Sequence, residues 1–149
     1  MEFRNKVGFA CNALAAALAA SFGVVYLLST QFMPYHAQAI GRDWQDLDAN
    51  LQVLLLAMIK VIGAGYLVGA VVMTMLLIIP WRRGDPWARW TVFVQGLGVS
   101  LYSAGAALFV ERHTIARPPW EAAVIGGVLV TVGFFLAPKV PKEVSHPFA

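Results

Sequence analysis

Residues 51–79 constrain the fold more than any other part of the chain, because they form a long, predominantly apolar stretch with a single charged residue, Lys60. Residues 61–79 alone form a run of 19 uncharged residues. A helix rises about 1.5 Å per residue and needs roughly 20 apolar residues to cross a hydrocarbon core about 30 Å thick. Residues 51–79 therefore predict a membrane-spanning helix.

Three more apolar stretches predict three further spans, over residues 7–30, 87–110 and 120–137. Only 13% of the 149 residues are charged, compared with about 25% in an ordinary soluble domain. The polar segment 31–50 is long for a connection, so a short helix near Trp44 is expected within it. We predict one domain, residues 1–149, with an all-α fold: an antiparallel bundle of four transmembrane helices.

Two helix starts carry local signals. Asp46 or Asp48 can act as the N-cap of the second span, since a carboxylate accepts hydrogen bonds from the free N–H groups of a first turn. Asp85 followed by Pro86 predicts the start of the third span, because proline is well suited to the first helical position.

The distribution of lysine and arginine predicts the orientation. With the N-terminus inside, seven basic residues lie on the inner side and three on the outer side, so both termini are expected in the cytoplasm (N-in/C-in). All five tryptophans fall near predicted membrane interfaces, as anchoring residues do. The inner residues are Arg4, Lys6, Arg82, Arg83, Arg89, Lys139 and Lys142, and the outer ones are Arg42, Arg112 and Arg117.

The same distribution of apolar and basic residues indicates the membrane and the partners to expect. We expect a multi-pass protein of a bacterial cytoplasmic membrane, embedded in the lipid bilayer. The net charge of +3 comes from short basic runs beside the spans, so no nucleic-acid partner is expected. The loop over residues 81–90, rich in arginine and tryptophan, suits topology anchoring, anionic lipid or a cytoplasmic partner equally well.

Lys60 is the only charge inside a long apolar run, and two interpretations remain open. Counting back from residue 79 places it at the outer edge of the hydrocarbon, where its ammonium group can snorkel to the interface. Alternatively it pairs with Glu111, Glu121 or Asp48 in a pocket, since charges within a membrane usually mark a function. The second interpretation predicts a ligand-binding site in the outer half of the bundle, formed by Lys60, Tyr66, Glu111 and Glu121.

Two histidines, His36 and His113, fall on the outer side and are weak candidates for binding a metal or haem. No two ligands show the i, i+4 spacing of a metal-binding helix, so a metal site is not predicted and the cofactor stays unknown. In the third span, the amide of Gln95 needs a partner and is expected to bond to a neighbouring helix.

Small residues on two spans predict close helix packing. Gly65 and Gly69 form a GxxxG pair in the second span, and Gly96, Ser100 and Ala104 lie on one face of the third. The second span has a further small-residue face that contains Lys60 and Gly63. The face with Gly65 and Gly69 can pack within the chain's own bundle, and the face with Lys60, the only charge in the span, is expected to meet a partner or a ligand.

No arrangement of residues indicates catalysis, because the sequence contains no Ser-His-acid grouping, phosphate-binding glycine loop or HExxH motif. The function expected first is therefore a non-catalytic interaction or structural subunit, or an accessory factor, of a membrane assembly or homo-oligomer. The alternative is a carrier or binding protein for a small hydrophobic or ionic ligand. A membrane enzyme is the third possibility.

Overall fold

The computed structural model describes residues 3–137, and this part of the chain folds into helices without a β-strand. The prediction of an all-α fold is confirmed for these residues, whereas Lys139 and Lys142 lie outside them. The elements in chain order are α1 Phe3–Leu28, α2 Pro34–Ile40, the 3₁₀ turn η1 Trp44–Asp46, α3 Ala49–Leu76, the π-helical turn η2 Leu77–Trp81, α4 Pro86–His113 and α5 Trp120–Leu136.

Three of the helices are long and apolar enough to cross a membrane: α1, α3 with its continuation η2, and α4. The fourth, α5, has 17 residues and is shorter than these. α1 begins at Phe3 rather than residue 7, and α4 continues to His113 rather than residue 110. Charged residues end an apolar run but not a helix, which accounts for both differences.

Both expected helix starts are present, but only one of the two N-cap side chains makes a capping hydrogen bond. Asp48 is the N-cap of α3, and its carboxylate accepts a hydrogen bond of 3.0 Å from the Leu51 N–H. Asp85 is the N-cap of α4 and Pro86 its first residue, but the Asp85 side chain makes no capping hydrogen bond. The restricted backbone of proline is therefore the clearer start signal for α4.

The connection between α1 and α3 contains a true helix, α2, and only a single 3₁₀ turn at Trp44. α2 begins at Pro34 and ends before Gly41, which adopts a φ of 71° that suits glycine. The ring of Trp44 lies 5.0 Å from that of Phe32, edge to face. Phe32 also belongs to a small apolar cluster with Leu47 and Ile59, so the connection is packed onto the start of α3.

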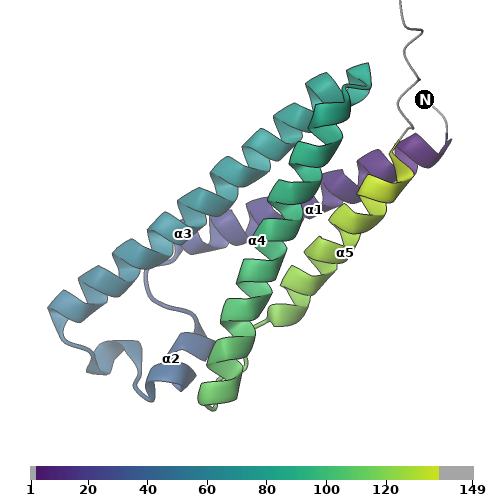
Figure 1. Ribbon diagram of the computed structural model, residues 1–149. Helices are drawn as coiled ribbons and strands as arrows, with labels where there is room; N and C mark the ends of the chain where they lie inside the picture. The colour runs from purple at the N-terminus through teal and green to yellow at the C-terminus, as the bar shows by residue number, and fades with distance from the viewer. Residues whose placement is uncertain (1–2, 138–149) are drawn as a thin grey trace, which may run out of the picture.

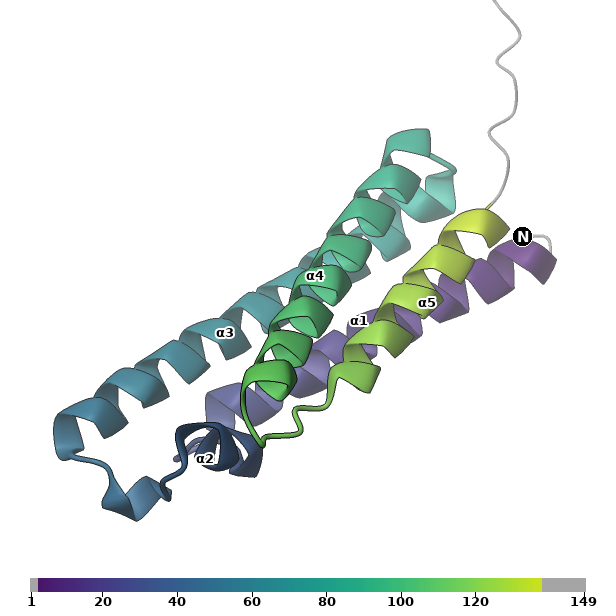
Figure 2. The ribbon, with the colours of Figure 1, turned by 60° about the horizontal axis from the view of Figure 1, so that its bottom comes forward.

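α1 occupies the central position among the long helices, because it packs against both α3 and α5, and α5 in turn packs against α4 (Figure 1). α3 and α4 follow each other in sequence but share far fewer contacts. Figures 1 and 2 show them diverging from the turn that joins them. The α1–α3 crossing is tightest at two glycines: a methyl group on Gly23 would lie 2.9 Å from the Gly63 carbonyl oxygen.

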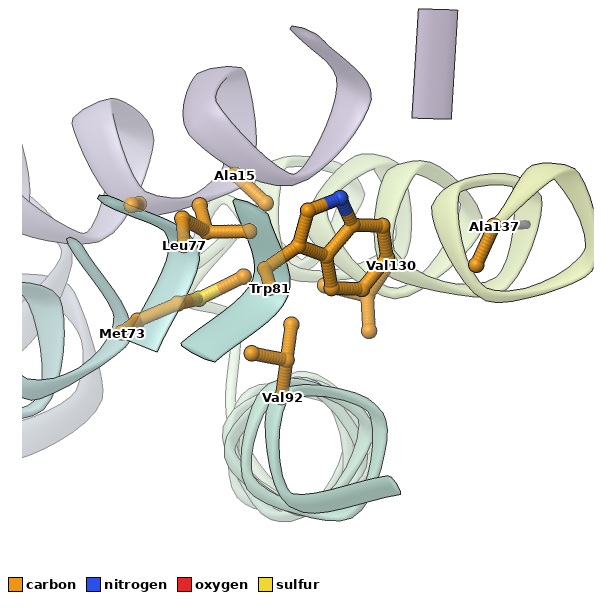
Figure 3. Packing of buried hydrophobic residues seen from close by; sticks show 8 residues of the cluster. Ala15, Met73, Leu77, Trp81, Val92, Val130 and Ala137 are labelled. Atoms are coloured by element: carbon orange, nitrogen blue, oxygen red, sulfur yellow. The ribbon is translucent and has the colours of Figure 1, made fainter. Parts of the chain in front are cut away.

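Trp81 lies inside the protein, although the sequence suggested an interfacial anchor. Its side chain is only 3% exposed, and Figure 3 shows the indole among Leu77, Val92 and Val130. Its Nε1–H donates to Asn5 Oδ1 over 3.2 Å, so the polar edge is satisfied as well. Pro80 has no N–H to continue the α-helical ladder, and the chain widens here into the π-helical turn that contains Trp81.

Candidate functional site

Lys60 binds the end of a neighbouring helix. Its Nζ donates to the carbonyl oxygens of Leu27 at 2.8 Å and Ser29 at 3.4 Å. These carbonyls belong to the C-terminal end of α1, where the helix dipole is negative and carbonyl groups lack partners within the helix. Lys60 of α3 thus caps the C-terminal end of α1, a role that neither interpretation of the sequence predicted.

Tyr66 of α3 connects three helices. Its hydroxyl and the Ser103 hydroxyl on α4 lie 2.6 Å apart, and its ring is 6.2 Å from Phe22 and 6.5 Å from Tyr26 of α1. The Tyr26 hydroxyl in turn hydrogen-bonds the hydroxyl of Tyr35 on α2. Aromatic rings and hydroxyl pairs therefore tie α1, α2, α3 and α4 together in this half of the molecule.

Gln95 provides a second link between α3 and α4. Its Nε2 donates to the Gly69 carbonyl oxygen over 2.8 Å, as expected for an amide within a span. The long side chains of Gln95 and Tyr66 thus bridge two helices whose backbones have few contacts. We call this strip, defined by the pairs Gln95–Gly69 and Tyr66–Ser103, the α3–α4 seam.

Two surface hollows lie away from the four residues predicted to form a ligand site. One surface hollow of about 560 Å³ is lined by residues between Gln31 and Asp46, and another of about 630 Å³ lies between α2 and the α4–α5 connection. Lys60, Tyr66, Glu111 and Glu121 line neither. Glu111 is in the last turns of α4 and Glu121 in the first turn of α5.

The two histidines have separate environments. His36 Nδ1 accepts a hydrogen bond of 3.2 Å from the Met33 N–H, and its ring is 4.2 Å from that of Tyr35. Burial lowers the pKa of His36, and burial is also the main cause that raises the pKa of Tyr35. His113 is exposed and contacts the Phe109 carbonyl oxygen at 2.7 Å. Within residues 3–137, no three metal-binding side chains come together.

The small residues of α4 lie against α5. A methyl group on Gly96 would lie 2.6 Å from Val130 Cγ2, and one on Gly127 would lie 3.2 Å from Ser100 Cβ. Ala104 of the same face is buried. Small side chains on both helices thus permit their close approach.

The two glycines of the GxxxG pair differ. A methyl group on Gly69 would meet only Gln95 Nε2, at 3.4 Å, and one on Gly65 would meet no described atom within 4 Å. Met58 and Val72, on the same face, are also exposed. Contrary to the expectation from the sequence, the chain uses the face of α3 that carries Gly63 and Lys60 to pack against α1, and Gly65 on the other face is left uncovered.

Sequence reasoning missed the contact between α1 and α5. Asn12 is fully buried there, and its Nδ2 donates to the Gly8 carbonyl oxygen over 3.0 Å. Its Oδ1 has no partner among the described residues. The absence of a side chain on Gly133 makes room for this amide, because any β-carbon would overlap it. The sequence signal that could have indicated this contact was a polar residue in one apolar segment, Asn12, and a glycine in another, Gly133.

No family model, curated protein or solved structure matches the chain. The polar groups described above are satisfied mainly by other groups of the chain itself: Lys60 by carbonyls, Tyr66 by Ser103, Gln95 by a backbone oxygen. Such an arrangement orients helices. It supplies neither a paired general acid and base nor a positioned nucleophile.

Proposed function

We propose that the chain is a multi-pass protein of a bacterial cytoplasmic membrane, in which α1, α3, α4 and α5 cross the bilayer as an antiparallel bundle with both termini in the cytoplasm. The 17 residues of α5 reach about 26 Å, near the lower limit for a span. The basic residues Arg82, Arg83 and Arg89 near the turn into α4 support a cytoplasmic location for that end.

Within this membrane the chain acts as a non-catalytic structural or interaction subunit of an assembly or homo-oligomer. One observation carries this proposal: the small residues beside the α3–α4 seam are uncovered. Methyl groups on Gly65, Gly98 and Gly105 would meet no described atom within 4 Å. Gly65 precedes Gly69 by four residues and Gly98 follows Gln95 by three, so both lie on the same side of their helices as the Gln95–Gly69 pair.

Uncovered glycines within spans favour a second helix over lipid. Lipid chains are as apolar as leucine, so helices in a bilayer associate through close backbone approach, which glycine permits. The other close approaches of this chain, at Gly23 with Gly63 and at Gly96 with Val130, are already used internally. The open glycines beside the seam are therefore suited to a helix of another subunit.

The test uses the G65L/G98L double variant, which fills the open positions with bulky side chains. If these glycines contact another subunit, the purified double variant should lose the oligomeric state or the partner that the wild type keeps in mild detergent. Size-exclusion chromatography with light scattering measures this difference. V71L is the matched control, because Val71 is exposed and lies about 120° around α3 from Gly65. A wild-type protein that is monomeric in mild detergent and forms no cross-links in its native membrane would contradict the proposal.

The alternative, a carrier for a small hydrophobic or ionic ligand, has less support. The Nζ of Lys60 and the hydroxyl of Tyr66 already have partners within the chain. A ligand at this site would have to displace the α1 carbonyls from Lys60. The proposed subunit role requires no such rearrangement.

A further inference from the structure

One end of the molecule concentrates positive charge. Arg4 and Lys6 lie in the first turns of α1, and Arg82, Arg83 and Arg89 flank the start of α4. Figures 1 and 2 show the start of α1, the end of α5 and the turn into α4 at the same end of the helices. Within residues 77–90 the only acidic residue is Asp85. We call these five cations the basic end.

Aromatic rings hold two of these guanidinium groups in place. The Cζ of Arg82 is 5.7 Å from the centre of the Phe9 ring, and that of Arg89 is 4.3 Å from the centre of the Phe134 ring. A guanidinium stacked on a ring face keeps its N–H donors at the edge, available to an oxyanion. The buried Nε of Arg89 has no hydrogen-bond partner among the described residues.

Two tryptophans lie beside these arginines with much of their surface uncovered. Trp87 and Trp90 are 56% and 57% exposed, and the Trp90 ring packs at 4.6 Å on the same Phe134 ring as Arg89. Tryptophan prefers the headgroup level of a bilayer, where its ring contacts apolar groups and its N–H contacts polar ones. A ligand for this end should therefore be both anionic and amphipathic.

We propose that the basic end binds the headgroup phosphate of an anionic phospholipid. Arg82 and Arg83 donate to the phosphate oxygens, Arg89 contributes positive charge at the ring of Phe134, and Trp87 and Trp90 lie beside the glycerol and upper acyl chains. A free phosphate offers the same oxygens but would leave the exposed surfaces of both tryptophans uncovered. This lipid site is independent of the subunit role, because it involves other residues at another place on the molecule.

The experiment measures lipid retention by native mass spectrometry. Protein in mild detergent is mixed with equal amounts of phosphatidylglycerol and phosphatidylcholine of the same chain length, and the ratio of bound lipids is read directly. The wild type should retain phosphatidylglycerol preferentially. R82Q/R83Q should reduce this preference about fivefold for each arginine removed, the effect typical of one basic residue near an anionic surface. The control R112Q/R117Q removes the same charge from two exposed residues near the α4–α5 connection and should leave the preference unchanged.

Several outcomes would overturn the proposal: no preference in the wild type, an unchanged preference in R82Q/R83Q, or an equal loss in the control. If thermal unfolding shows that the double variant is destabilised, R83Q alone decides, because Arg83 is exposed and stacks on no ring among the described residues. Inorganic phosphate is added as a competitor. Displacement of the lipid at millimolar phosphate would show a site for a free anion and refute the lipid assignment.

Discussion

A methyl group on Gly63 would lie 3.0 Å from the carbonyl oxygen of Gly23, so these two glycines set how closely α3 and α1 approach. The same methyl group would lie 2.8 Å from the Leu27 backbone nitrogen, which cannot move without moving α1. Lys60 and Tyr66, one turn away on either side of Gly63, contact α1 as well. The α1–α3 pair is therefore sensitive to changes at this level.

Gly63→Ala is expected to destabilise the protein relative to Gly65→Ala by about 1–3 kcal/mol, the usual cost of overpacking. Both variants gain equally from replacing glycine by alanine within a helix. Because Gly65 has no described atom within 4 Å of an added methyl group, the difference isolates the steric effect at Gly63 when both variants are compared as monomers in a dissociating detergent. Thermal unfolding in detergent, followed by circular dichroism, measures it. Equal midpoints for the two variants would refute the close approach.

Lys60→Met should lower the free energy of unfolding by about 1 kcal/mol, because the carbonyl groups at the end of α1 lose a charged donor. Lys60→Arg keeps the charge and the donors, so it should retain most of the stability. The unfolding midpoints of the two variants are compared under the same conditions. If methionine is tolerated as well as arginine, the lysine does not cap α1.

Tyr66→Phe removes the hydrogen bond to Ser103 and leaves the ring in place. We expect a loss of about 0.6–2 kcal/mol, the range for hydrogen bonds between membrane helices. Tyr102→Phe, at a residue that is 85% exposed, serves as the control and should have little effect. A similar response of both variants would show that the seam is not held by this bond.

Acid should loosen the start of α2. The neutral Nδ1 of His36 accepts the Met33 N–H, and a protonated Nδ1 cannot. Because burial lowers the pKa of His36 in the folded protein, its contribution is complete above the unfolded value of about 6.5 and is lost as the pH falls through the folded value.

Hydrogen–deuterium exchange of α2, corrected for the intrinsic effect of pH, measures this loosening. Protection of residues 34–40 should fall below about pH 6.5 in the wild type, whereas His36→Ala should show low protection at every pH. His113→Ala, which changes the exposed histidine, should behave as the wild type does. Protection that is independent of pH in the wild type would exclude the His36 mechanism.

The lengths of the apolar runs located the long helices well, because the length of such a run is itself a physical requirement for spanning a bilayer. The inner face of each helix is harder to predict. Lipid and protein interiors are both apolar, so polarity does not distinguish the face that meets lipid from the face that meets α1. Gly63 and Gly65 are equivalent by residue type, and only the position of Gly23 on α1 determines which one is covered.

The sequence identified candidate residues that need a partner, but it did not identify the groups with which they pair. An amide at Gln95 and a lysine at residue 60 need partners on physical grounds, and both have them. The partners are backbone carbonyls of other helices, which every residue carries and no sequence pattern marks. The prediction for Trp81 was wrong for a related reason: its location beside arginines is typical of an interface, but its indole N–H bonds to Asn5, 76 residues earlier in the chain.

The central position of α1 also constrains the order of assembly. Of the two helices that α1 packs against, α3 follows it closely in the sequence, whereas α5 is synthesised only after α3 and α4. Until α5 leaves the ribosome, Asn12 has no Gly133 beside it. The polar side of α1 is therefore enclosed only after α3 and α4 have been made.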